Sequence, residues 1–272
     1  MTPQHEADLL DLAILASQPS GAAVARVTAS TDPASALVGK TVLVGAIDPC
    51  GQCEVCRRGG AAVCPSPRPR RDGRVSSRWV VPLGDGLDVP APAAAAIAGD
   101  VATAYTLYAR TGLAPRDPVV ITGATAVARF LVEIVRAKGI TPVVIATDAD
   151  WIAWLVSKGA SAVATATEVA AAVAAQGLGT RPLRVIATDP STLALAASLA
   201  GPRATLTVLA PANAPVPGEL LAREVTIIGV AGPHPDLVTE AAAMCVKGEI
   251  DLAAGVTMDP GDRTRALVIS HS

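Results

Sequence analysis

The chain has 272 residues, of which 51% are hydrophobic, 2% are aromatic and 17% are charged, with a formal net charge of -2. This length allows one large domain or two small ones, and the near-neutral charge gives no reason to expect nucleic acid or an anionic membrane as a partner. No run of about 18 apolar residues is present, so no membrane span is expected. Met1–Leu9 lacks a basic segment followed by an apolar one, which argues against a signal peptide and predicts a cytoplasmic protein.

Residues 1–98 contain short strand-like runs that Gly and Pro interrupt. These runs predict a first, mainly β domain. The predicted strands are Ala22–Ala29, Thr41–Ile47 and Arg78–Pro82.

A four-cysteine motif interrupts this domain at residues 49–65, with the spacing C-x2-C-x2-C-x7-C. Four thiolates complete a tetrahedral Zn²⁺ site without an open position, so the predicted ion is structural. An iron–sulfur centre also uses four cysteines, and four unrelated thiols are the remaining alternative. Cys245, in an apolar helical stretch, is interpreted as a small buried hydrophobe. The predicted ligands are Cys50, Cys53, Cys56 and Cys64.

Seven arginines lie in or after the cysteine motif. A zinc module with basic residues could contact nucleic acid, but no aromatic residue interleaves with the arginines before Trp79. A solvated charged face is therefore favoured, and nucleic acid is not expected as a partner. The seven are Arg57, Arg58, Arg68, Arg70, Arg71, Arg74 and Arg78.

Residues 99–250 have a regular pattern in which runs rich in Val and Ile alternate with helical stretches. Such alternation predicts βαβ units and a doubly wound parallel sheet of six strands. The tail, residues 251–272, ends in an apolar run and is expected to return to the first domain. The predicted strands are Pro118–Thr122, Pro142–Thr147, Ala162–Ala164, Arg184–Thr188, Thr205–Ala210 and Val225–Val230, and the predicted helices are Ala126–Ala137, Ala149–Lys158, Glu168–Ala175, Ser191–Ala200 and Pro235–Val246.

The turn after the strand Pro118–Thr122 has the position of a G-x-G-x-x-G dinucleotide fingerprint. Gly123 supplies the tight turn, but Thr125 stands where a second glycine would let the backbone approach a pyrophosphate. The helix that follows offers free N–H groups for a phosphate. The predicted phosphate-binding residues are Gly123, Thr125, Ala126 and Val127.

Asp148 ends the next predicted strand, about twenty residues beyond the turn, where a carboxylate binds the ribose hydroxyls of NAD. Its alternative role is the N-cap of the helix Ala149–Lys158. No arginine follows this strand end to receive a 2′-phosphate, so NAD is favoured over NADP.

These features together resemble the zinc-containing medium-chain dehydrogenase/reductase superfamily, the alcohol dehydrogenase family. The stretch from Pro49 to Gly59 resembles its structural zinc lobe, and 102–105 resembles the helix that enters its nucleotide domain. The resemblance implies a Rossmann-like domain at 99–250 beside a reduced GroES-like domain at 1–98, an NAD(P) cofactor and a small-molecule substrate.

The catalytic zinc of that family does not carry over. Ser20-Gly21-Ala22 stands at the approximate place of a Gly-His-Glu ligand motif, and Gly99 and Asp100 stand at the third ligand position. The histidines of the chain, His5, His234 and His271, do not restore the motif and are expected at the surface. Hydride transfer without the metal needs another proton donor, for which Asp100 and Tyr105 are the candidates.

Two functions remain in competition. The first is an NAD(P)-dependent oxidoreductase that lacks catalytic zinc, which the regular nucleotide domain favours. The second is a catalytically inactive dehydrogenase-fold protein with a structural or partner-binding role. The strand Val225–Val230 resembles the edge that pairs between subunits of this superfamily, so we expect a homodimer, or a heteromer with a complete relative.

Overall fold

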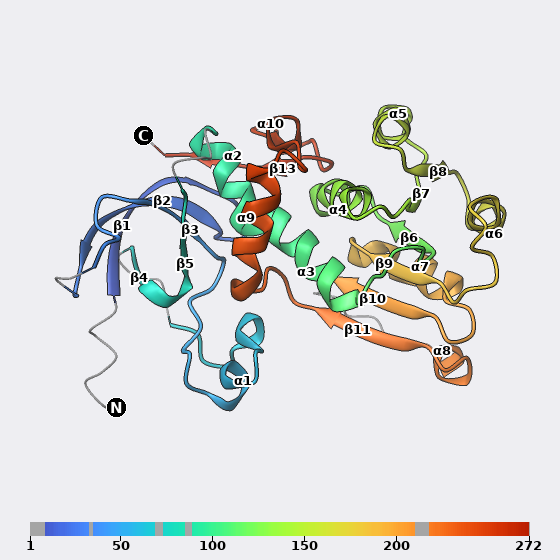
Figure 1. Cartoon of the computed structure of the whole chain (residues 1–272), viewed down its shortest axis with the longest axis horizontal. Helices are drawn as coiled ribbons and strands as arrows, with labels where there is room; N and C mark the ends of the chain where they lie inside the picture. Colours follow the sequence, from blue (N-terminus) through green and yellow to red (C-terminus); the bar gives the residue numbers. More distant parts are fainter. Residues whose placement is uncertain (1–8, 33–34, 69–72, 85–88, 210–217, 272) are drawn as a thin grey trace. The chain divides into compact units, whose positions relative to one another are not determined.

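The computed structural model describes residues 9–32, 35–68, 73–84, 89–209 and 218–271. The chain forms two compact units (Figure 1). The first unit consists of Met1–Thr103 and Pro233–Ser272, and the second of Ala104–Gly232. The boundary between Gly232 and Pro233 separates the predicted strand Val225–Val230 from the predicted helix Pro235–Val246. The strand belongs to the second unit and the helix to the first.

The second unit is built on a parallel sheet of six strands in the order β11-β10-β9-β6-β7-β8. Numbered from β6, this is the strand order 6-5-4-1-2-3 of a doubly wound nucleotide-binding sheet. The predicted α/β fold class is confirmed, and all six predicted strands are present. Their bounds are β6 Val119–Thr122, β7 Val143–Ile145, β8 Ser161–Val163, β9 Arg184–Ala187, β10 Thr205–Leu209 and β11 Thr226–Val230. Ala210, the last residue of one predicted strand, lies outside the described residues.

Helices connect these strands within a few residues of the predicted bounds. A core of small aliphatic side chains, among them Val120, Val185 and Leu206, lies between helices and sheet. The bounds are α4 Ala126–Ala137, α5 Ala149–Ser157, α6 Ala166–Ala175, η5 Pro190–Thr192, α7 Leu193–Leu199 and α8 Gly218–Ala222.

Helix α4 is buried along most of its length, including two charged residues, Arg129 and Glu133. The Arg129 guanidinium carbon lies 4.2 Å from the ring centroid of Trp154, and Lys158 Nζ lies 2.6 Å from Glu133 Oε1. A buried charge is tolerated only when it is paired or otherwise compensated. The cation–π contact and the ion pair therefore allow α4 to pack against α5.

The first unit contains an antiparallel sheet in the order β14-β1-β2-β3-β5, and β4 also pairs with β1. β1 is not among the strands predicted from the sequence, because its residues LLDLAILAS do not alternate cleanly between apolar and polar. β1 nevertheless pairs with three other strands, β2, β4 and β14. The bounds are β1 Leu9–Ser17, β2 Ala23–Ser30, β3 Thr41–Val44, β4 Arg74–Ser76, β5 Val80–Pro82 and β14 Ile269–Ser270.

Helical segments complete the first unit. Helix α2 (Ala91–Ala96) packs on β1 and β2, and runs through a π-helical turn, η4 (Ile97–Val101), into α3 (Ala102–Thr111), most of which belongs to the second unit. Helix α9 (Val238–Val246) contacts η4. The remaining segments are α1 Glu54–Arg57, η2 Ala61–Val63, η3 Ser77–Trp79, η6 Pro235–Leu237, α10 Leu252–Gly255, β12 Val256–Thr257 and β13 Ala266–Leu267.

In the part of the chain that the structure describes, no helix combines the length and the apolar character that crossing a bilayer requires.

Candidate functional site: a four-cysteine centre and a nucleotide turn

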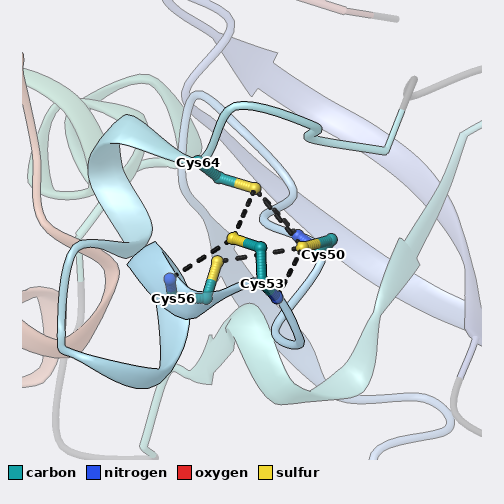
Figure 2. A group of neighbouring side chains, drawn as sticks. All are labelled: Cys50, Cys53, Cys56 and Cys64. Carbon is teal, nitrogen blue, oxygen red and sulfur yellow. Dashed lines mark hydrogen bonds between the residues drawn. The ribbon is translucent and has the colours of Figure 1, made fainter.

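The four predicted cysteine ligands converge in space, with all four sulfur atoms within 4.8 Å of one another (Figure 2). The Sγ of Cys50 lies 3.5 Å from that of Cys64 and 4.0 Å from that of Cys56. A tetrahedron with Zn–S bonds of about 2.3 Å has edges of roughly 3.8 Å. The sulfur spacing therefore fits a structural zinc site, and the residue set leaves no position for a substrate.

Turns of the backbone orient these four sulfur atoms toward one another. The amide N–H groups of Cys50, Cys53 and Cys56 each donate to the sulfur of another cysteine of the set, at 3.4 Å. Gly51 has φ +72°, a backbone conformation that favours glycine. The lobe is thus arranged by local backbone geometry, which explains why its sequence spacing is so informative.

The two strongest pKa shifts in the lobe have opposite directions. Hydrogen bonds from the backbone of Gln52 and Cys53 lower the pKa of Cys50 to about 6. Burial raises the pKa of Cys56 to about 12. Metal ligation requires thiolates, so the backbone hydrogen bonds favour the ligating form of Cys50, whereas burial opposes that form of Cys56.

His234 connects the lobe to the C-terminal part of the first unit. It is only 8% exposed, and its Nε2 lies 2.6 Å from the backbone oxygen of Gly59, three residues after Cys56. The expectation of a surface histidine is wrong here, because the hydrogen bond compensates for burial of the ring. His271 is exposed as expected, and His5 lies outside the described residues.

Three of the arginines around the lobe have acidic partners. Arg57 and Arg58 both pair with Glu54, and Arg74 pairs with Asp11. The Arg78 guanidinium carbon lies 4.7 Å from the ring centroid of Trp79. These contacts favour the solvated charged face over a nucleic-acid surface. Arg70 and Arg71 lie outside the described residues.

The nucleotide turn lies at the carboxyl ends of β6 and β9, the point where the strand order of the sheet reverses. Gly123 has φ +104°, and a Cβ there would lie 2.6 Å from the hydroxyl oxygen of Thr188 and 3.0 Å from the Cβ of Asp189. Only glycine fits this position. Gly123 therefore supplies the first glycine of the dinucleotide fingerprint.

Thr125, at the second fingerprint position, is the N-cap of α4. Its hydroxyl accepts from the Ala128 N–H at 3.1 Å and donates to the Thr188 hydroxyl at 3.3 Å. The Thr188 hydroxyl in turn donates to the backbone oxygen of Thr122 at 2.9 Å. This directional chain of three hydrogen bonds occupies one of the N–H groups that an anion at the helix N-terminus would use.

Asp148 is exposed at the end of β7, and its Oδ1 accepts from the Trp151 N–H at 2.8 Å. The carboxylate therefore has the N-cap role, one of the two interpretations that the sequence left open. A second carboxylate oxygen remains in the same group, so capping does not by itself remove the capacity to accept from a ribose hydroxyl.

Gln18 is a residue that the sequence analysis did not single out. Its Nε2 donates to Asp100 Oδ2 at 2.6 Å, and the Asp100 N–H donates to Gln18 Oε1 at 3.2 Å. Burial raises the pKa of Asp100, and the hydrogen bond from Gln18 partly opposes this effect. A Cβ at residue 99 would overlap the Gln18 side-chain oxygen, so Gly99 and Gln18 are mutually dependent.

Tyr105, the other proposed proton donor, lies on α3. Its ring centroid lies 5.7 Å from that of Tyr108. Among the residues that the structure describes, the four cysteines are the one group of three or more His, Cys, Asp or Glu side chains close enough to share a metal ion.

Comparison with known proteins gives matches at the level of structure. No protein-family model matches the chain, and no curated relative does. Galactitol-1-phosphate dehydrogenase from Escherichia coli superposes with a TM-score of 0.78 at 19% identity, over 92% of this chain and 85% of that one. A short chain alcohol dehydrogenase from E. coli CFT073, in complex with NADH, gives 0.78 at 16% identity, over 100% and 94%.

A cobalt- and zinc-bound thermostable alcohol dehydrogenase from Pyrobaculum aerophilum gives a TM-score of 0.73 at 18% identity, over 97% of this chain and 91% of that one. The chain has the alcohol dehydrogenase fold. The resemblance inferred from the cysteine spacing is thereby confirmed for the fold, and the four cysteines of this alcohol dehydrogenase-like chain fit its structural zinc lobe.

Replacing Cys53 by Ser should remove zinc from this alcohol dehydrogenase-like chain and lower its free energy of unfolding by several kcal/mol, since a structural metal contributes directly to folding. Metal analysis and thermal unfolding measure both effects. Cys245→Ala is the matched control, because Cys245 is buried in α9 away from the cysteine set and should leave the zinc content unchanged. Full zinc content in the Cys53→Ser protein would contradict the assignment.

Replacing His234 by Ala should speed the loss of zinc to a chelator, because the Gly59 carbonyl loses a hydrogen bond worth about 1 kcal/mol. The rate of metal transfer to a chromogenic chelator measures the effect. His271→Ala provides the comparison, since its side chain bonds to Ser17 and not to the lobe. Equal rates for the two variants would show that His234 does not hold the lobe.

Proposed function

We propose that this chain is an NAD(P)-dependent oxidoreductase that works without a catalytic zinc ion and retains only the structural one. The observation that carries the proposal is the Gly123 turn at the reversal point of a six-stranded parallel sheet, with α4 beginning directly after it. Ligands of doubly wound sheets bind in this position. A structural neighbour that contains NADH aligns over the whole of this chain, which supports the same location for the cofactor.

The dinucleotide would lie on Gly123, Thr125, Ala126 and Val127, with Asp148 at its ribose. When bound, the cofactor supplies or accepts the hydride. The absence of an arginine directly after β7 favours NAD over NADP. The hydroxyl of Thr125 must leave the Ala128 N–H before a phosphate can bind there, so we expect weak cofactor binding.

Asp100 is the better of the two candidate proton donors. Burial raises its pKa, so it holds a proton at higher pH than an exposed carboxyl group does. The Gln18 Nε2 donates to the Asp100 carboxyl group, and the Gln18 Oε1 accepts from the Asp100 backbone N–H. Tyr105 is the second candidate proton donor. The substrate of the proposed reaction is an alcohol or a carbonyl compound.

The cofactor site is tested by titrating NADH and NADPH and following their fluorescence. Thr125→Gly should bind NADH about fivefold more tightly than the unmodified chain, because it removes a competing hydrogen bond of about 1 kcal/mol. Gly123→Val should abolish binding, since its side chain would overlap Thr188.

Thr125→Ser is the matched control for this titration, since it keeps the hydroxyl and should bind as weakly as the unmodified chain. Tighter binding by both Thr125 variants would assign the obstacle to the methyl group of Thr125. No saturable binding by any folded variant would overturn the oxidoreductase proposal and favour the inactive, partner-binding alternative.

We also propose that the chain forms a homodimer, or a heteromer with a complete relative, through β11. This strand is the edge of its sheet, and Thr226, Ile227 and Gly229 are exposed on it. An exposed apolar strand edge is a template for pairing with another chain.

Replacing Ile227 by Lys should convert the dimer to a monomer, because a charge at the centre of a paired edge opposes association. Size-exclusion chromatography with light scattering measures the change. Ile269→Lys, on the exposed strand β14 of the first unit, is the control and should remain dimeric. A monomer near 27.3 kDa for the unmodified chain would refute both assemblies.

A further inference from the structure

The antiparallel sheet of the first unit is incompletely filled on one face. Its packed part is an aliphatic cluster that includes Leu10, Val27 and Val42. A cavity of about 370 Å³ adjoins this cluster and shares Ala23, Val44 and Val75 with it. Small residues leave the space open, because Gly21, Ala23 and Gly73 line it where larger side chains would fill it.

The walls of this cavity are aliphatic. Leu12 and Ile14 follow one another on the same face of β1, with Val44 of β3 and Val75 of β4 beside them. Ile14 is 36% exposed although Ala25, its partner on β2, is fully buried. An apolar cavity of this volume lies at the lower end of the range of small-molecule sites.

One polar pair lines the cavity. Ser17, the last residue of β1, and His271 both contribute to its lining, and Ser17 Oγ lies 2.8 Å from His271 Nε2. Strand pairing holds the two in place, since Ser17 is opposite Ile269 and the His271 N–H donates to the Leu15 carbonyl at 3.0 Å. The Ser17 hydroxyl retains hydrogen-bonding capacity beyond this one bond.

We propose that this cavity is a binding site for a small aliphatic alcohol, with the chain against Leu12, Ile14, Val44 and Val75 and the hydroxyl on the Ser17–His271 pair. A hydroxyl fits the pair in either histidine tautomer, because it both donates and accepts. An alcohol of about eight carbons needs roughly 270 Å³ at about 30 Å³ per heavy atom, so the cavity of about 370 Å³ has room for it. All nine lining residues belong to the first unit, so this site is separate from the proposed nucleotide turn.

The test uses 1-octanol as the probe and the full, zinc-loaded chain, with methyl NMR shifts of Leu12, Ile14, Val44 and Val75 as the readout. Saturable shifts of these methyl groups are expected. 1-Hexanol should bind roughly tenfold more weakly, since two methylene groups leave the apolar wall. 1,8-Octanediol should also bind more weakly, because its second hydroxyl stands where 1-octanol places an apolar methyl group against the aliphatic walls.

Two sets of variants locate the site. Ala23→Leu should fill the cavity and weaken 1-octanol binding at least tenfold, whereas Ala13→Leu, at an exposed position of β1 outside the lining, should leave it unchanged. Ser17→Ala and His271→Ala should each weaken binding about fivefold through loss of a hydrogen bond.

The absence of saturable methyl shifts in the unmodified chain would overturn the proposal. Binding by folded Ala23→Leu equal to that of the unmodified chain would do the same. If both polar variants and 1,8-octanediol match the unmodified chain with 1-octanol, the assigned polar end is wrong. None of these outcomes depends on whether NADH binds to the second unit.

Discussion

The central constraint on this structure is that a chain with 51% hydrophobic but only 2% aromatic residues must build its cores from Ala, Val, Leu and Ile. Small side chains bury little area each, so stability requires close approach of many of them. The parallel sheet satisfies this requirement, since its strands are covered by Ala-rich helices such as α6 and α7. Phe130, the one phenylalanine of the chain, is fully buried in α4. In the first unit the same composition leaves a cavity that larger side chains would have filled.

The cysteine lobe is the part of the first unit that this aliphatic packing does not explain. Cys56 and Cys64 are buried, and thiolates in that setting require a cation. A metal ion bound there would replace a hydrophobic core locally, and His234 ties the lobe to the segment that leads into α9. The four cysteines offer no open coordination position, so such an ion would be a component of the fold.

The positions where a dehydrogenase-like chain would hold its ligands share a different property. Their polar side chains form hydrogen bonds with other groups of the protein. The Thr125 hydroxyl accepts from an N–H of the first turn of α4, and the Asp148 carboxylate caps α5. Gln18 donates to Asp100. Each bond stabilises the unliganded protein, and a ligand must compete with it. The proposed oxidoreductase would therefore bind its cofactor less tightly than a chain with glycine at position 125.

The sequence by itself determined the alternation of strands and helices in the second unit, the glycine turn and the four-cysteine motif. These features depend on local periodicity and on short spacings, which a linear pattern records directly. Only the tertiary structure decided that β1 is a central strand, that His234 is buried, and that Gln18 meets Asp100. The partners are separated by 175 residues in the His234–Gly59 contact and by 82 in the Gln18–Asp100 contact, and no local pattern encodes them. The long-range hydrogen bonds that stabilise these polar side chains exist only after the chain has folded.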